Sequence, residues 1–287
     1  MSIDPLAFRV RSSQSVSLRD WPTRVKPFYT SEKDYACLLE RHVERLQGLQ
    51  ELHWASHTHA LLLIFQGMDA AGKDGVIQHV MSGVNPAGCR VVSFKVPSAE
   101  ESEHDFLWRS ALQLPARGQI GIFNRSYYEE VLIVRVHPHL LRTEGFSQEV
   151  AHPKGLWKRR YQSIVALERH LHRSGTLILK FFLHMSKAEQ RTRFLARIED
   201  PERNWKFSLS DVEERRYWKD YTKAYEACLT ATSGPHAPWY IVPADDKQNA
   251  RLIVSQTIVS SLEGLKMTFP RVSPKRAREL KAIARQL

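Results

Sequence analysis

The segment GMDAAGK, residues 67–73, fits the pattern G-x-x-x-x-G-K, which grips phosphate groups. It follows the apolar run LLLIF and precedes a segment of helical character, the setting that makes the pattern specific. Glycines let several backbone N–H groups point inward, and the next helix adds its own N–H groups and the positive end of its dipole. Lys73 adds a charge for a phosphoryl group in transfer. The segment predicts a phosphate-binding loop, with a structural glycine turn as the alternative.

Two acidic residues lie in or beside this loop. Asp69 lies inside it, where a bare carboxylate repels phosphate unless a divalent cation lies between them. We therefore predict that Asp69 is a metal ligand. Asp74 stands where such loops usually carry Ser or Thr. A carboxylate at a helix start is also favoured by the helix dipole, so a helix-start acid is the alternative for Asp74.

A second polar cluster follows the apolar run QIGIF. Asn124 ends this run, where a strand end can reach a metal through a neutral oxygen or a held water. Arg125 can bind phosphate oxygens in a bidentate manner, with a salt bridge as the alternative. Glu129 and Glu130 follow. For each there are two interpretations: it assists the metal or the acceptor, or it lies on a solvated face of the element. Arg135 lies on the same predicted element.

The pattern of apolar residues predicts the elements that position these motifs. Short apolar runs predict five strands, at residues 60–66, 90–96, 119–124, 176–185 and 238–244. Helical spacing predicts helices at residues 31–52, from about 72, and at 102–114, 127–136, 155–175, 186–198, 210–232 and 246–265. Ser186 with Glu189, and Ser210 with Glu213, have the spacing of capping boxes. The alternation predicts one three-layer α/β domain with a five-stranded parallel sheet and an N-terminal helical extension, binding ligands at the carboxyl ends of the strands.

The composition is ordinary except for its charge. The 287 residues, 43% hydrophobic and 25% charged, can bury a core for one large domain or two small ones. The net charge of +11 is typical of proteins that bind a polyanion. The alternative interpretation is a basic protein that has no polyanionic partner. Three scattered cysteines indicate neither a disulfide framework nor a CxxC metal site. No apolar run approaches the roughly 20 residues that span a bilayer, so we expect a soluble cytoplasmic protein.

Seven ordered motifs together resemble the polyphosphate kinase 2 family, over roughly residues 30–265. They are GMDAAGKDG, MSGVNPAGCRVVSFKVPS, DFLWR, FNRSYYEEVLIVRVH, LKFFLHMSKAEQ, NWKFSLSDVEERRYW and APWYIVPADDK. The resemblance implies a P-loop kinase fold with a helical lid. It also implies reversible, Mg²⁺-dependent phosphoryl transfer between inorganic polyphosphate and a nucleotide, with Mn²⁺ as an alternative metal. NRS followed by YEE is similar to the subgroup that phosphorylates both AMP and ADP. Asn124 falls where many members carry Asp, and Tyr127 where His is expected in close relatives.

The resemblance assigns roles to the residues that match these motifs. Asp69, Lys73 and Arg125 are expected to act in catalysis, with Asp69 also the metal ligand. Contacts to phosphate or nucleotide are expected from Gly67, Ala70, Ala71, Gly72, Asp74, Gly75, Asn124, Glu129, Arg135, Arg193 and Lys206. Polyphosphate also needs a groove of cations, as the phosphates of nucleic acids do. Its candidates are Lys158, Arg159, Arg160, Lys180, Arg191, Arg193, Arg203, Lys206, Arg215 and Arg216, with a solvated helix face as the alternative for each lid cation.

The resemblance also divides the chain and limits its partners. We expect an N-terminal arm at residues 1–30, a polyphosphate kinase 2 P-loop domain at 31–270 with its lid at about 197–221, and a basic tail at 271–287. Expected partners are inorganic polyphosphate and adenine nucleotides, with guanine as an alternative base. We expect no nucleic acid, no membrane, and a homo-oligomer, either dimer or tetramer. The rival hypotheses are a nucleoside monophosphate kinase that uses ATP, and a non-catalytic binder of RNA or polyphosphate.

Overall fold

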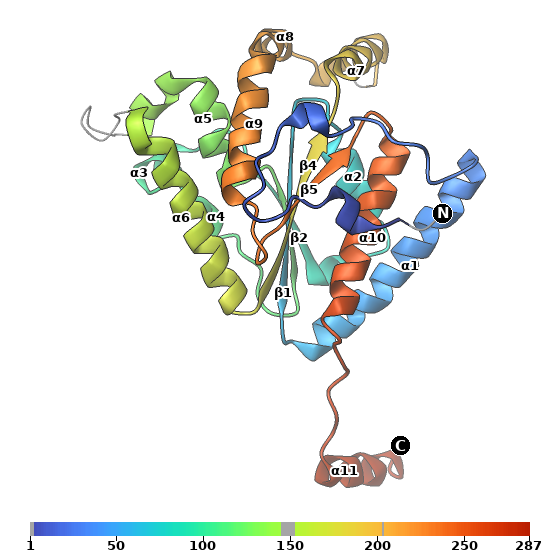
Figure 1. The fold of residues 1–287 in the computed structure, drawn as a ribbon. Helices are drawn as coiled ribbons and strands as arrows, with labels where there is room; N and C mark the ends of the chain where they lie inside the picture. Colours follow the sequence, from blue (N-terminus) through green and yellow to red (C-terminus); the bar gives the residue numbers. More distant parts are fainter. Residues whose placement is uncertain (1–2, 145–152, 203) are drawn as a thin grey trace.

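A five-stranded parallel sheet forms the centre of the molecule (Figure 1). The computed structural model describes residues 3–144, 153–202 and 204–287. The strands are β1 (Ala60–Gly67), β2 (Cys89–Ser93), β3 (Ile120–Asn124), β4 (Thr176–His184) and β5 (Trp239–Pro243). They lie in the order β2-β3-β1-β4-β5, and every pair is parallel. The five predicted strands and the α/β fold class are confirmed.

Helices cover both faces of the sheet, which explains why β1 is apolar along its whole length. Every residue of β1 is buried, and successive side chains point to opposite faces. Leu61 and Leu63 pack in one core with α1 (Glu32–Ser56), α2 (Lys73–Val80) and α10 (Lys247–Gly264). Leu62 and Ile64 pack in a second core with α6 (Pro153–Arg173) and α9 (Trp218–Thr232). The result is the predicted three-layer arrangement (Figure 1).

Two segments predicted as continuous helices are interrupted. Residues 102–114 hold the end of α3 (Ala99–Glu103) and then α4 (Trp108–Ala111). Between them the Asp105 carboxylate accepts the backbone N–H of Leu107, and this local turn competes with the helix. Residues 127–136 form the 3₁₀ helix η4 (Tyr127–Val131) and then α5 (Ile133–Val136). The prediction of one unbroken helix is therefore wrong for both segments.

The predicted lid region is built from short elements above the sheet. They are the last turn of α7 (Lys187–Glu199), then η6 (Asn204–Lys206), α8 (Leu209–Glu214) and η7 (Arg215–Tyr217), and they lead into α9. The helix predicted at residues 210–232 is thus interrupted by a 3₁₀ turn and begins earlier than predicted. Its cap is Ser208 rather than Ser210, in a complete capping box with Asp211. The Ser186 cap of α7 is confirmed, because its hydroxyl accepts the N–H of Glu189.

The predicted N-terminal arm packs across the sheet edge, and we call residues 3–25 the strap (dark blue in Figure 1). The Val10 N–H donates to the carbonyl of Trp239 at 2.9 Å, which pairs the strap with β5. The N–H groups of Val16 and Leu18 donate to Thr230 Oγ1 and Glu226 Oε1 on α9. Their apolar side chains are buried, so the strap is part of the core.

The basic tail forms a helix that lies away from the sheet (Figure 1). This helix, α11 (Pro274–Ala284), has no buried residue, as expected of a surface helix. Throughout residues 3–144, 153–202 and 204–287, no helix has both the length and the apolar character needed to cross a membrane.

Candidate active site

A cavity of about 1470 Å³ opens at the carboxyl ends of the central strands. Its walls come from the phosphate loop (residues 67–73), from the ends of β2 and β3, and from α7 and α10. Ligands of open parallel α/β sheets bind at this edge. Asp69, Lys73, Asp74, Asn124 and Arg125 all line the cavity, so the two sequence motifs converge in one place.

The backbone of the phosphate loop requires two of its glycines. A Cβ atom on Gly67 would come within 3.0 Å of both the Ala71 Cβ atom and the Leu183 carbonyl oxygen. Gly72 precedes α2 with a φ of 97°, in the left-handed region that side chains disfavour. Ala70 adopts a φ of 60°, also left-handed. The chain therefore curls tightly between β1 and α2, as an anion-binding loop requires.

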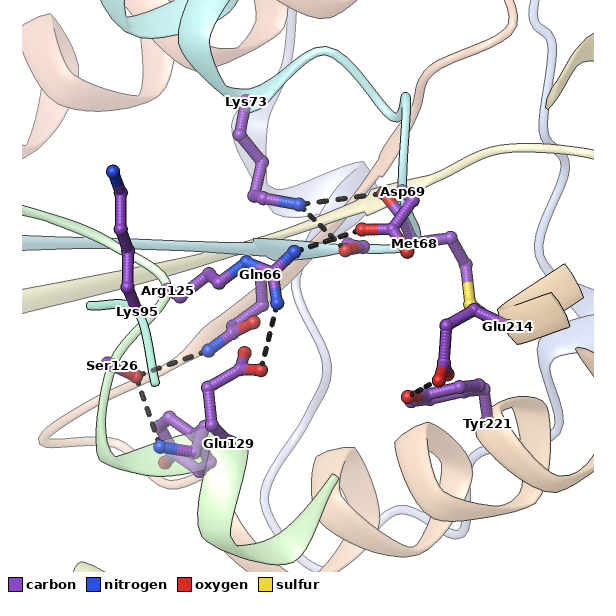
Figure 2. Close-up of polar contacts among 12 residues, drawn as sticks. Gln66, Met68, Asp69, Lys73, Lys95, Arg125, Ser126, Glu129, Glu214 and Tyr221 are labelled. Carbon is purple, nitrogen blue, oxygen red and sulfur yellow. Dashed lines mark hydrogen bonds and ion pairs between the residues drawn. The ribbon is translucent and has the colours of Figure 1, made fainter. Parts of the chain in front are cut away.

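Lys73 reaches back over this curl (Figure 2). Its ammonium group donates to the carbonyl oxygens of Gly67 at 2.9 Å and Met68 at 3.5 Å. Only 9% of the residue is exposed. Burial lowers its pKa to about 8, and repulsion from the Arg125 guanidinium contributes to this shift. An arriving phosphate would stabilise the charged form of Lys73 and take the place of these carbonyl contacts.

Side chains of α7 hold the next three carbonyls of the loop. Gln190 Nε2 donates to the carbonyl oxygen of Asp69 at 3.0 Å. Arg193 donates to the carbonyl oxygens of Ala70 at 3.0 Å and Ala71 at 2.9 Å, and also to that of Ala244 after β5. Arg193 lines the cavity, and in this structure its guanidinium holds the loop backbone. Its contact with phosphate stays a prediction, and support of the loop is a second role that the structure adds.

Arg125 lies between two carboxylates in the cavity wall (Figure 2). Its guanidinium is 2.9 Å from Asp69 Oδ1 and 3.3 Å from Glu129 Oε2. Glu129 and Asp69 raise the pKa of Arg125, against the effect of burial. The salt bridge weighed as the alternative is thus present, but it faces the site. Arg125 also has a φ of 63°, a left-handed conformation that is costly for a side-chain-bearing residue and is concentrated at functional sites.

Asn124 connects the strand end to the loop helix. Its amide nitrogen donates to Asp74 Oδ1. Asp74 lies in the first turn of α2 and lines the cavity, so its position is compatible with both a helix-start acid and a role in the site. The hydrogen bond keeps one Asp74 oxygen close to the end of β3.

The donor set fits a metal that is shared with phosphate. Among the described residues, no group of three or more His, Cys, Asp or Glu side chains is arranged to hold a metal by itself. Magnesium in phosphoryl-transfer sites binds one or two carboxylates and completes its shell with phosphate oxygens and water. Asp69 and Asp74 present such carboxylates to the cavity, and the Asp69 side chain is 33% exposed.

Several predicted cations lie outside the cavity wall. Arg135 donates to the Tyr161 hydroxyl at 2.8 Å and lies over the Trp157 ring. Lys180 is fully buried against Glu168, and Arg160 is 3% exposed against Glu130. The predicted phosphate contacts of Lys180 and Arg160 are corrected, because both side chains are buried within the protein. The half-buried Arg135 lies outside the cavity wall, and its phosphate contact stays a prediction. Lys158, Arg159, Arg191 and Arg216 are exposed. Arg203 and the side chain of Lys206 lie outside the described residues.

Sequence reasoning missed five cations that do line the cavity: Lys95, Arg109, Arg197, Lys247 and Arg251. Lys247 and Arg251 begin α10 four residues apart, and this spacing on one helix face was the available signal. Lys95 and Arg109 gave no such signal, because Lys95 follows the end of β2 and Arg109 lies on α4, after the break that separates it from α3. Gln190 was missed as well, since a glutamine in an amphipathic helix normally indicates a solvated face.

The model of the polyphosphate kinase 2 family matches residues 29–270. A protein of Rhodopseudomonas palustris named ADP-polyphosphate phosphotransferase is 60% identical over all of this chain and 99% of its own length. A protein of Meiothermus ruber named AMP/ADP-polyphosphate phosphotransferase is 47% identical over 79% of this chain and 80% of its own.

A solved structure has the same fold. The crystal structure of polyphosphate kinase 2 from Arthrobacter aurescens superimposes with a TM-score of 0.87 at 39% identity, covering 98% of this chain and 97% of that one. The similarity therefore extends over the strap and the tail as well as the residues that the family model matches.

Proposed function

The chain belongs to the polyphosphate kinase 2 family, and from this premise we propose that it transfers a phosphoryl group from inorganic polyphosphate to ADP and to AMP. It is a polyphosphate-dependent nucleotide phosphotransferase, with polyphosphate and adenine nucleotides as substrates. The observation that carries the proposal is the meeting of Lys73, Asp69 and Arg125 at one wall of a single large cavity. The reaction is reversible, since a phosphoanhydride bond is broken and another is formed.

The cavity suits two polyanionic substrates. Its volume of about 1470 Å³ exceeds the usual range of roughly 300–1,000 Å³ for small-molecule sites. Cations lie on both sides of the phosphate loop, with Lys95 and Arg109 on the β2 side and Lys247 and Arg251 on the α10 side. This division supports one phosphate chain on each side, with the transferred group at the loop.

Phosphoryl transfer through a loose transition state depends mainly on positioning and on neutralisation of charge. We assign Lys73 and Arg125 to the oxygens of the transferred group. Arg125 exchanges its ion pairs with Asp69 and Glu129 for contacts with phosphate. A divalent metal, which we propose to be Mg²⁺, neutralises charge between the two phosphate chains when it is bound, and Asp69 with Asp74 would hold it. The acceptor is already ionised, so the reaction requires no strong general base.

The acceptors can be separated experimentally. The names of both relatives include ADP, and the name of the Meiothermus ruber protein also includes AMP. We propose AMP as a second acceptor because Asn124 replaces the acid that many members carry. Changing Asn124→Asp should then lower the rate with AMP more than the rate with ADP. An unchanged ratio of the two rates removes Asn124 from the choice of acceptor.

The test of the function is a chromatographic nucleotide assay. The protein is incubated with AMP or ADP, long-chain polyphosphate and Mg²⁺, with no ATP added. We expect ADP and then ATP from AMP, and ATP from ADP. Lys73→Ala should abolish both products, whereas Lys33→Ala, an exposed lysine on α1, should not. Turnover that requires ATP as donor would support a nucleoside monophosphate kinase. Salt-sensitive binding of polyphosphate without turnover would support a non-catalytic binder.

A further inference from the structure

One buried glutamine links the phosphate loop to the lid. Gln190 lies on α7 with 3% of its surface exposed, and both ends of its amide are used. Its Nε2 donates to the carbonyl oxygen of Asp69 at 3.0 Å, and its Oε1 accepts from the Arg215 guanidinium at 2.8 Å. A carbonyl can only accept and a guanidinium can only donate, so these partners fix the orientation of the amide.

The two partners belong to different functional parts. Asp69 is the loop residue that pairs with Arg125 and is assigned to the metal. Arg215 begins η7, the turn between α8 and α9 at the base of the lid. Arg215 also donates to the carbonyl oxygen of Lys187 at 2.8 Å, which docks this turn onto the start of α7. Gln190 therefore lies between the docked turn and the backbone of Asp69.

The space beside this link is part of the same site. A small cavity of about 40 Å³ is lined by Asp69, Arg125, Gln190 and Arg215, among other residues. The Asp69–Arg125 ion pair and the Gln190–Arg215 hydrogen bond thus border one gap of roughly the size of a water molecule. A displacement of the turn at Arg215 would therefore change the contacts of Gln190, whose amide also touches the carbonyl of Asp69.

Arg193 provides a contrast on the same helix. It holds the carbonyl oxygens of Ala70 and Ala71, and it is anchored to Ala244 at the end of β5 and to Glu189. These partners lie on the sheet and on α7 itself, outside the predicted lid. Arg193 therefore supports the loop without any contact to the turn at Arg215, whereas the amide of Gln190 is hydrogen-bonded to that turn.

We propose that Gln190 is a positioning residue, which fixes the backbone of Asp69 when Arg215 docks the base of the lid onto α7. The inference deepens the proposed function, and it rests on that function for its kinetic consequence. Docking holds the amide oxygen, which orients the amide nitrogen toward the carbonyl of Asp69. The docked turn thus holds the loop geometry on which transfer depends.

Two substitutions at Gln190 separate its two bonds. Gln190→Met removes both bonds at similar volume. Gln190→Glu retains an acceptor for Arg215 but has no N–H for the carbonyl of Asp69. Misplacement by about 1 Å can cost 10²-fold in rate, so we expect each variant to lower kcat by about 10- to 100-fold, with a smaller effect on KM. Leu195→Gln, an exposed position on the same helix, is the matched control.

A double-mutant cycle tests the coupling to the lid. If Gln190 transmits the docking of Arg215, then Arg215→Met should lower kcat in the wild type and hardly lower it further in Gln190→Met. Additive effects on kcat would overturn the proposal, as would a kcat of Gln190→Glu within twofold of the wild type. An additional rise in the KM for polyphosphate would report a direct contact of Arg215 with substrate, and it leaves the kcat comparison intact.

Hydrogen exchange gives a readout that needs neither substrate nor metal. We expect amides of the phosphate loop to exchange faster in Gln190→Met and in Arg215→Met than in the wild type, with unchanged exchange in β4. Unchanged loop exchange in both variants would overturn the proposal. Because this measurement requires no turnover, it still decides the positioning role if the protein fails the nucleotide assay.

Discussion

Replacing Lys180 with methionine would break a charged network in the interior of the protein. Lys180 has no exposed surface, and its ammonium group donates to Glu168 at 2.7 Å and to the Tyr128 hydroxyl and the Thr232 carbonyl at 2.8 Å each. The other Glu168 oxygen accepts from the hydroxyls of Tyr127 and Tyr128, at 3.0 and 2.7 Å. Burial lowers the pKa of Lys180, and the Glu168 carboxylate opposes this shift.

The size of the effect follows from what the substitution leaves behind. In Lys180→Met, one Glu168 oxygen and the Thr232 carbonyl lose their donor inside the core. Breaking a buried ion pair from one side costs about 3–5 kcal/mol, a large part of the roughly 5–15 kcal/mol that stabilises a typical domain. The melting temperature should fall by roughly 6–20 °C, since about 2–4 °C is lost per kcal/mol in chains of this size class.

The assay is equilibrium unfolding in urea, monitored by circular dichroism. Adding Glu168→Gln to Lys180→Met removes the uncompensated charge, so the double variant should recover part of the loss. Arg45→Met is the comparison, because the Arg45–Glu263 pair has a similar separation of 2.8 Å on the surface and should contribute less than about 1 kcal/mol. The reasoning is refuted if Lys180→Met loses less than about 1 kcal/mol, or if the double variant loses as much as the two single variants together.

Two further perturbations address the site and one addresses the strap. The pKa of Lys73 is near 8, so its ammonium group loses its proton above that pH. The affinity for tripolyphosphate, measured without metal by titration calorimetry, should therefore be constant below pH 8 and fall above it. The affinity of Lys73→Arg should depend less on pH. Gly72→Ala forces a side chain into a φ of 97° at a cost of roughly 1–2 kcal/mol, and urea unfolding should show this loss but none for Gly48→Ala, which meets nothing within 4 Å. Deleting residues 1–22 removes four buried apolar side chains, Phe8, Val10, Val16 and Leu18. Each contributes roughly 1.5–3 kcal/mol of burial, partly offset by the entropy of ordering the strap, so the melting temperature should fall clearly. An unchanged melting temperature would mean that the strap contributes no net stability.

The strands and the loop were readable from sequence because local pattern determines them. A short apolar run between helices is typical of a buried strand in a parallel sheet, and G-x-x-x-x-G-K predicts the curl of its own backbone. The break at Asp105 was not readable, because residues 102–114 keep helical spacing on both sides of it. The cap at Ser208 rather than Ser210 was missed because both serines have an acid three residues later, and packing decides between them.

The outer support of the site was unreadable for a different reason. Gln190 and Asp69 are 121 residues apart, and the local sequence around neither residue indicates that the two are in contact. Lys180 was assigned to a phosphate groove, because a lysine in an apolar strand does not reveal that Glu168 and two tyrosines surround it. A sequence motif identifies functional side chains whose role depends on their own residue type and spacing. It does not identify side chains whose role depends on a partner that is distant in sequence and close only in the folded protein.

The strap also determines the order in which this chain can fold. It is synthesised before its hydrogen-bond partners, because Thr230 and Glu226 lie 214 and 208 residues further along the chain. At about 5–20 residues per second, a ribosome needs roughly 10–40 s to make that stretch. During this interval the apolar side chains of the strap have no edge to cover, and β5 does not yet exist. The strap can therefore dock only after α9 and β5 have been synthesised.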